Sequence, residues 1–158
     1  MSPLILNLLI LCSTSLFHVI SSTSTDIHDL LPEYGFPKGL IPNNAISYTI
    51  STDGFFTIQL DSPCYVHFSD QYLVYFHTRL TGKLSYGSVT RVSGIQAQIL
   101  FLWPSVTGIK VHKDSGMLEF FAGALSQKLP AEEFVNVPGC SPKACQGGST
   151  ATNLVDRV

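Results

Sequence analysis

The chain has no charged side chain before Asp26, whereas charges are spaced normally after it. This uncharged stretch contains an apolar run, Leu4 to Leu11, and ends in the small polar residues 21–25. The arrangement is typical of a cleaved secretory signal peptide, although no Lys or Arg precedes the apolar run. Polar residues at 13–15 and 18 leave the segment short of the roughly 20 apolar residues that a membrane span needs. We therefore expect residues 1–24 to be a signal peptide.

The remaining chain has little net charge and no second long apolar run. Nine Lys and Arg stand against eleven Asp and Glu, for a formal charge of −2. This balance gives no electrostatic reason to expect nucleic acid as a partner, and no membrane span is expected in the mature chain. The length favours one domain. We expect a single β-rich domain at residues 25–141 and a flexible polar tail at residues 142–158, which is rich in Gly, Ser and Thr.

Cysteine is scarce, and cleavage of the signal peptide would leave Cys64, Cys140 and Cys145. In an oxidising compartment an odd number predicts one disulfide and one leftover thiol. The residues alone leave two pairings open, a long loop from Cys64 to Cys140 and a short loop from Cys140 to Cys145. Since no His stands at a ligand spacing beside these cysteines, no metal site is expected, and no cofactor motif is present.

The hydrophobic pattern predicts strands after one short helix. Thr25 or Asp26 can cap a helix whose apolar residues recur at helical spacing, and Pro and Gly then end it. From Ala45 the period is two, and a three-residue turn at 52–54 pairs Ile46, Tyr48 and Ile50 with Leu60, Ile58 and Phe56. Further strands are predicted at 64–68, 72–77, 83–86, 96–103, 108–113 and 117–121, with a helical turn at 130–134. The pattern favours a mainly β fold, an antiparallel barrel-like or sandwich domain with a short N-terminal helix.

The hairpin 64–77 has one fully apolar face and one mixed face. The mixed face carries Tyr65, His67, Tyr75 and His77. Aromatic rings with polar tips are typical of small-molecule sites, so these four residues are candidate ligand-binding residues. The competing interpretation, which aromatic strands favour in general, is that another layer simply packs over them.

The chain lacks the common catalytic patterns. Ser85 stands in Lys83-Leu84-Ser85-Tyr86-Gly87, which does not have the first Gly of a nucleophile elbow. Cys64 could face His77 across the hairpin, but a secreted thiol is more often consumed in a disulfide. His67, His77 and His112 have no metal-ligand spacing. We therefore expect no catalytic residues.

An ordered set of motifs identifies a family. The motifs are Tyr34-Gly35-Phe36-Pro37-Lys38-Gly39-Leu40-Ile41-Pro42, Asp53-Gly54-Phe55-Phe56, Ser62-Pro63-Cys64, Leu80-Thr81-Gly82-Lys83-Leu84-Ser85-Tyr86-Gly87, Gly94-Ile95-Gln96, Leu100-Phe101-Leu102-Trp103 and Val137-Pro138-Gly139-Cys140. With them, residues 26 to 141 resemble the plant secreted family known as domain of unknown function 538.

The resemblance implies an antiparallel β-structure with an N-terminal helix and a location in the apoplast or cell wall. It also implies a disulfide between Cys64 and Cys140, because the family pattern has Cys at both positions. For the family, lipid-type ligand binding has been proposed by analogy to bactericidal permeability-increasing proteins, and so has esterase activity. We expect a secreted, non-catalytic domain that binds an apolar or lipid-like small molecule. The alternatives are a small-ester hydrolase, with Ser85 or another serine as nucleophile, and an interaction protein of the wall or secretory path.

Overall fold

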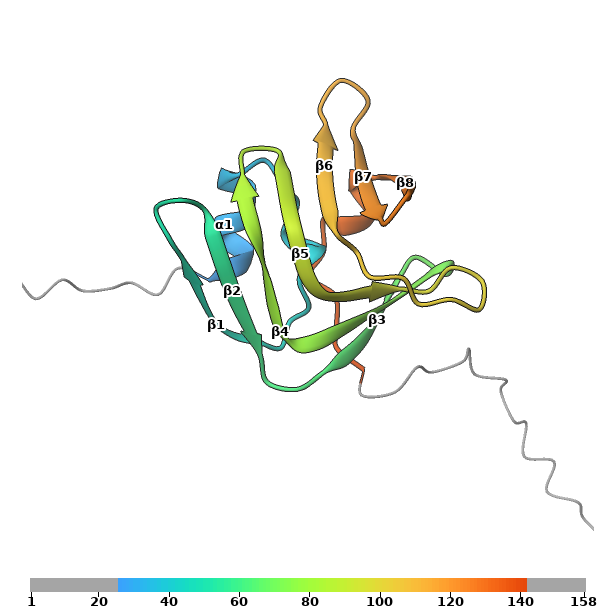
Figure 1. Ribbon diagram of the computed structural model, residues 1–158, viewed down its shortest axis with the longest axis horizontal. Coiled ribbons are helices and arrows are strands. Elements are labelled where there is room, and N and C mark those ends of the chain that lie inside the picture. Colours follow the sequence, from blue (N-terminus) through green and yellow to red (C-terminus); the bar gives the residue numbers. More distant parts are fainter. Residues whose placement is uncertain (1–25, 142–158) are drawn as a thin grey trace, which may run out of the picture.

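A computed structural model describes residues 26–141 (Figure 1). The predicted signal peptide, the predicted polar tail and Cys145 lie outside these residues. The described chain contains one α-helix, two 3-10 helices and eight strands. In chain order these are α1 (Ile27–Glu33), η1 (Lys38–Leu40), β1 (Ala45–Ile50), β2 (Phe55–Leu60), β3 (Cys64–Phe68), β4 (Tyr72–Ser85), β5 (Ser88–Ala97), β6 (Gly108–His112), β7 (Met117–Ala122), β8 (Leu125–Pro130) and η2 (Ala131–Phe134).

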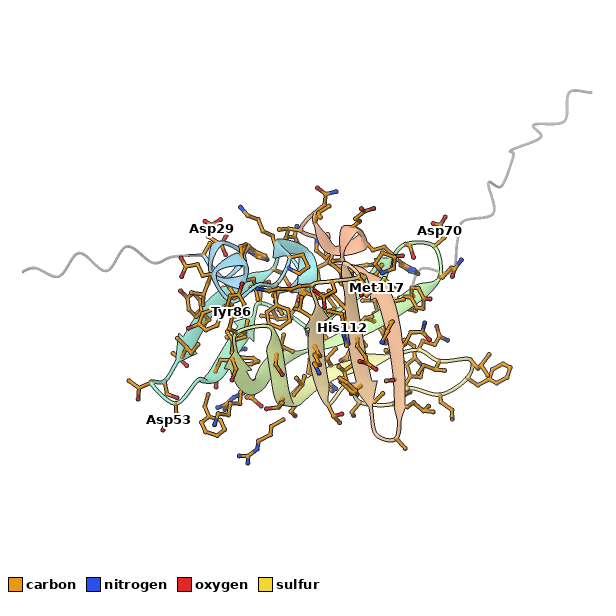
Figure 2. All side chains as sticks on the ribbon, turned by 90° about the horizontal axis from the view of Figure 1, so that it is seen from above. Asp29, Asp53, Asp70, Tyr86, His112 and Met117 are labelled. Atoms are coloured by element: carbon orange, nitrogen blue, oxygen red, sulfur yellow. The ribbon has the colours of Figure 1, made fainter. Side chains whose placement is uncertain are left out.

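The strands form one antiparallel sheet in the order β1-β2-β4-β5-β6-β7-β8, and β3 also pairs with β4. The sheet does not close, because no ladder joins β1 to β8. β4 has 14 residues, so β3 pairs with its first half and β2 with its second half. Figure 2 shows the helical segments together on one side of the sheet. The mainly β, antiparallel fold with a short N-terminal helix is confirmed. No helix among residues 26–141 is long and apolar enough to cross a membrane.

The helix α1 is capped and anchored by its first residues. Asp26 is the N-cap, and its carboxylate accepts a hydrogen bond from the backbone N–H of His28. The His28 ring is buried, with Nδ1 2.8 Å from the Asp26 carboxylate and Nε2 3.1 Å from the carbonyl of Ile41. This ring therefore ties α1 to the connector that follows η1. The apolar side of α1 then packs Ile27 and Leu31 into the core.

The first hairpin has the predicted register except at its open end. Ile50 pairs with Phe56 and Tyr48 pairs with Ile58, and Gly54 takes the positive φ of 84° that the three-residue turn requires. A β-bulge after Ala45 shifts the register, however, so Ala45 rather than Ile46 pairs with Leu60. The predicted Ile46–Leu60 pair is therefore wrong. The bulge turns Ile46 outward, where it is 63% exposed.

Three strand predictions need correction. The segments predicted at 72–77 and 83–86 belong to one long strand, β4. The strand predicted at 96–103 is wrong, because β5 ends at Ala97 and the chain then leaves the sheet. β5 and β8 were not predicted: β5 is mostly polar, and five of the six residues of β8 are exposed. The predicted helical turn is present as η2.

The two 3-10 helices touch each other through their backbones. A Cβ atom built on Gly39 of η1 would lie 2.5 Å from the carbonyl oxygen of Phe134 and 2.1 Å from that of Asn136. Only glycine permits this approach. The contact fixes the position of η2, whose Phe134 lines the cavity described next.

Candidate apolar binding site

A cavity of about 440 Å³ opens on the concave face of the sheet. Its walls come from both halves of the sheet: β3, β4 and β5 on one side and β6, β7 and β8 on the other. Since β3 and β8 are not neighbours in the sheet, the sheet must curl for both to reach one cavity (Figure 1). The volume lies within the range of roughly 300 to 1,000 Å³ that is usual for small-molecule sites.

The cavity interior is apolar and holds no charged residue. The buried lining residues are Leu40, Phe68, Phe76, Val106, Ile109, Leu129 and Phe134. Val74 and Phe76 of β4 pair with Ala97 and Ile95 of β5, so all four side chains point to the same face of the sheet. No Asp, Glu, Lys, Arg or His lines the cavity. An ionised group would therefore find no partner inside, so the interior suits hydrocarbon.

Except for the half-buried Tyr72, the polar lining residues are exposed and mark the mouth. Gln71, Gln98 and Gln127 belong to the lining and are exposed, as are the apolar residues Leu100 and Leu125. The backbone N–H of Gln98 donates to the backbone carbonyl of Leu73, so the chain just after β5 is fixed beside the start of β4. The cavity thus has an apolar interior and a rim of neutral amides.

Phe134 of η2 holds the two walls together. Its ring centroid lies 4.8 Å from that of Phe68 on β3 and 5.3 Å from that of Phe120 on β7. These separations are those of favourable aromatic pairs. No hydrogen-bonded ladder joins β3 to β7, so the ring of Phe134 bridges two walls that are not neighbours in the sheet.

A second gap, of about 50 Å³, lies between α1 and the sheet. Its lining is almost wholly apolar, including Leu31, Ile58 and Leu80. It has room for little more than a water molecule or two, and an apolar gap of this kind stays dry. We interpret it as a packing void.

The four ligand-binding candidates lie on the opposite face of the β3–β4 hairpin from the cavity. Tyr65 pairs with Tyr75, with ring centroids 4.8 Å apart, and the His77 ring lies 4.8 Å from that of Tyr75. His67 pairs with Leu73 and is exposed. Trp103 covers Tyr65 edge-on, at 6.0 Å between centroids. None of the four lines the cavity, and a binding role for them stays a prediction.

The structure does not bring the candidate catalytic residues into a catalytic arrangement. Cys64 pairs with Phe76, which places His77 on the opposite face of the hairpin, so the proposed Cys64–His77 pair is wrong. Ser85 is exposed at the end of β4, and no hydrogen bond joins it to a histidine in residues 26–141. Within the same range, His, Cys, Asp and Glu form no group of three that could hold a metal ion.

Cys140, near the C-terminal end of the described chain, lies beside Cys64 at the start of β3. Tyr65 and Ser141 exchange two backbone hydrogen bonds, of 2.7 and 3.0 Å, which bring the segment around Cys140 against β3. Both cysteines are free thiols in this structure, and Cys64 is buried. Burial, together with the hydrogen bond and charge of the adjacent Cys140, raises the pKa of the Cys64 thiol well above its ordinary value.

The pairing of these thiols is testable. We expect Cys64 and Cys140 to be disulfide-bonded in protein taken from an oxidising compartment, because their side chains are already neighbours. Peptide mapping without reduction is the measurement, and the same digest after reduction is the control. Recovery of a Cys140–Cys145 peptide instead would show that the local loop forms.

A polar trio on the β6–β8 strands resembles a catalytic triad in composition but not in order. His112 Nε2 lies 2.7 Å from one carboxylate oxygen of Glu119, and the Ser126 hydroxyl donates to the other at 2.9 Å. In a Ser-His-Asp triad the imidazole stands between the hydroxyl and the carboxylate. Here the carboxylate is in the middle, so the imidazole of His112 does not contact the serine. The trio is a cross-strand hydrogen-bond network.

This network predicts a pH dependence of stability. The hydrogen bonds from His112 and then Ser126 lower the pKa of Glu119 below its ordinary 4.5. A lowered folded-state pKa contributes stability that is present above pH 4.5 and is lost as the pH falls through the folded-state pKa. We expect Glu119→Gln to lower the melting temperature at pH 7 and to have a smaller effect at pH 3. Glu132 is exposed, so Glu132→Gln is the matched control. An equal fall in melting temperature at pH 7 and pH 3 for Glu119→Gln would contradict a stabilising role of the ionised Glu119 carboxylate.

These features define a class, an open antiparallel β-domain with an apolar cavity on its concave face. Residues 27–135 match the family described as "Protein of unknown function, DUF538", and the chain belongs to that family. An uncharacterized protein of Arabidopsis thaliana is 33% identical over 96 residues, which are 60% of this chain and 55% of the relative. The chain thus spans about half the length of the curated relative that it matches. The family resemblance drawn from the motifs is confirmed.

Proposed function

We propose that this protein is a secreted, non-catalytic binding protein for a neutral, lipid-like small molecule, which it holds in the 440 Å³ cavity. The observation that carries the proposal is a cavity of ligand size whose lining contains no charged residue. A domain of this size normally fills its core to crystal-like density, with few voids larger than a water molecule. A binding role is the simplest reason for one large apolar space.

The distribution of polar groups indicates the ligand's chemistry. An alkyl or isoprenoid portion fits among the side chains of Phe76, Ile109 and Leu129, which are buried. A neutral polar end fits at the rim, where Gln71, Gln98 and Gln127 supply amide donors and acceptors. A free carboxylate or phosphate would find no cationic side chain in the lining. The proposed class is therefore alcohols, esters or amides with a long apolar part.

Secretion is supported by two features of the chain. The stretch before Asp26 has the composition of a signal peptide. The neighbouring thiols of Cys64 and Cys140 are ready to form a disulfide, the kind of bond that persists in secreted proteins.

The direct test is ligand capture. The full chain, expressed in a plant host and purified, is incubated with a plant lipid extract and examined by native mass spectrometry. We expect a retained neutral ligand at one per chain. No retained mass, together with no response from a fluorescent hydrophobic probe, would contradict the proposal.

No observation favours the ester-hydrolase hypothesis over binding. Its test is separate from ligand capture: labelling with a fluorophosphonate reports an activated serine directly. A covalent adduct on Ser85 would revive the hypothesis, and a ligand cleaved during incubation would do the same.

A further inference from the structure

The chain between β5 and β6 forms a small hairpin that leaves the body of the domain. Gln96 pairs with Ser105, and Ile99 pairs with Leu102 through hydrogen bonds of 2.9 and 3.0 Å. The turn therefore contains only Leu100 and Phe101. Figure 1 shows this loop, in yellow, extending beyond the end of β5, and Figure 2 shows it protruding from the domain in a second view.

The tip of this hairpin is apolar, and three of its four residues are strongly exposed. We call Ile99, Leu100, Phe101 and Leu102 the apolar tip. Leu100 is 81% exposed, Phe101 94% and Leu102 70%. Adjacent exposed apolar side chains of this size are uncommon on a soluble protein and mark an interaction site.

The backbone conformation of the turn is unfavourable for a leucine at position 100. Leu100 has a φ of 56°, the only positive φ in the two-residue turn. Turns with a positive φ at the first central position strongly prefer Gly there, and a bulky residue in that region is strained. Strained residues of this kind gather at functional sites. A large apolar residue at Leu100 therefore requires a reason other than the turn.

The sequence on both sides of the apolar tip is uncharged. No Asp, Glu, Lys or Arg occurs from residue 92 to residue 109. Trp103 follows the tip and is half-buried against Tyr65. Tryptophan behind an apolar tip is the arrangement found where proteins meet the membrane–water interface. A segment without charge matches a neutral lipid surface better than a charged partner.

We propose that the apolar tip inserts into a neutral lipid bilayer and so places the cavity mouth at the membrane surface. Ile99 and Leu100 belong both to the tip and to the cavity lining, which makes the apolar path from bilayer to cavity continuous. The inference rests on the proposed function, because that path serves a ligand taken from or delivered to the bilayer. Membrane docking itself requires only the tip.

A second copy of this chain is the competing occupant. A stable protein interface buries about 800 Å² on each partner. The apolar tip is four residues on a protruding two-residue turn, and its convex shape suits a soft lipid surface better than a flat protein face. Self-association is therefore the outcome that the experiment must separate from docking.

The experiment uses phosphatidylcholine vesicles and the full chain from the plant host. Trp103 is the only tryptophan and directly follows the tip, so its emission reports the environment next to the tip. We expect vesicles to sediment the protein and to shift Trp103 emission to shorter wavelength, with little dependence on salt. The double variant Phe101→Ser, Leu102→Ser should bind vesicles about a hundredfold more weakly, because two large apolar side chains no longer enter the bilayer. Neither residue lines the cavity, so ligand retention should persist.

The matched control changes two exposed apolar residues elsewhere, Ile46→Ser and Val135→Ser, which are 63% and 55% exposed in the native chain. It should bind vesicles like the unchanged protein. Equal vesicle binding by both double variants, or none by the unchanged protein, would overturn the docking proposal whether or not ligand is retained. A dimer in sedimentation equilibrium that the tip variant loses would assign the tip to self-association. Vesicle binding without ligand retention would instead leave docking standing and contradict the proposed function.

Discussion

Replacing both Ala97 and Ala122 by phenylalanine is expected to weaken binding of a hydrophobic probe about sixtyfold while leaving the domain folded. Both alanines line the cavity from facing walls, Ala97 on β5 and Ala122 on β7. If the two rings deny the ligand about 100 Å² of apolar contact, the loss is about 2.5 kcal/mol, which is about sixtyfold in affinity. A probe titration followed by fluorescence is the measurement.

The control for this variant is Ala124→Phe. Ala124 is exposed in the turn between β7 and β8 and does not line the cavity. Thermal unfolding should show that both variants remain folded, because the added rings enter existing space rather than a filled core. Unchanged probe affinity in the Ala97→Phe, Ala122→Phe variant would mean that the ligand binds elsewhere, with the face of Tyr65, His67, Tyr75 and His77 as the first place to search.

Phe134→Ala is expected to lower the free energy of unfolding by about 3–5 kcal/mol, the usual cost of truncating a buried phenylalanine. Phe134 is 2% exposed and contacts the rings of Phe68 and Phe120 on opposite cavity walls. Its removal leaves these walls without their aromatic link, so probe affinity should fall as well. Urea unfolding measures the first effect and probe titration the second.

The same substitution at Phe101 is the matched control. Phe101 is 94% exposed, and exposed substitutions usually change stability by less than about 0.5 kcal/mol. A loss below about 1 kcal/mol for Phe134→Ala would show that η2 does not hold the open sheet together.

The sequence predicts the parts of the fold that follow from local alternation. Register in the first hairpin follows from keeping Tyr48 and Ile50 on the same face as their partners, and Gly54 marks the turn. The apolar face of β3 and β4 was predicted in the same way, and it supplies Val74 and Phe76 to the cavity.

The sequence could not predict the cavity itself, because its walls meet only through the curl of the sheet. β8 gives no alternating signal: Leu129 is its one buried residue. Apolar residues at 99–102 indicate a buried strand by composition, yet the structure exposes three of them strongly. A pattern shows which residues are apolar, but whether water or protein covers them depends on the tertiary arrangement.

The sequence signal that indicates the cavity is the fully apolar face of the β3–β4 hairpin, not its mixed face. The polar tips of Tyr65 and His77 favour a binding role in the sequence, although such residues lie at the outer surface of an open sheet as readily as at a site. The fully apolar face, with Phe68, Val74 and Phe76, points to the cavity.

The most direct measurement of the central claim is a crystal structure of the protein after incubation with plant lipids. The account predicts continuous density for one neutral ligand between Ile109, Phe120 and Phe134, with its polar end near Gln98 or Gln127 at the mouth. Ligand density on the outer face at Tyr65 and Tyr75, or a cavity closed by the surrounding side chains, would contradict it.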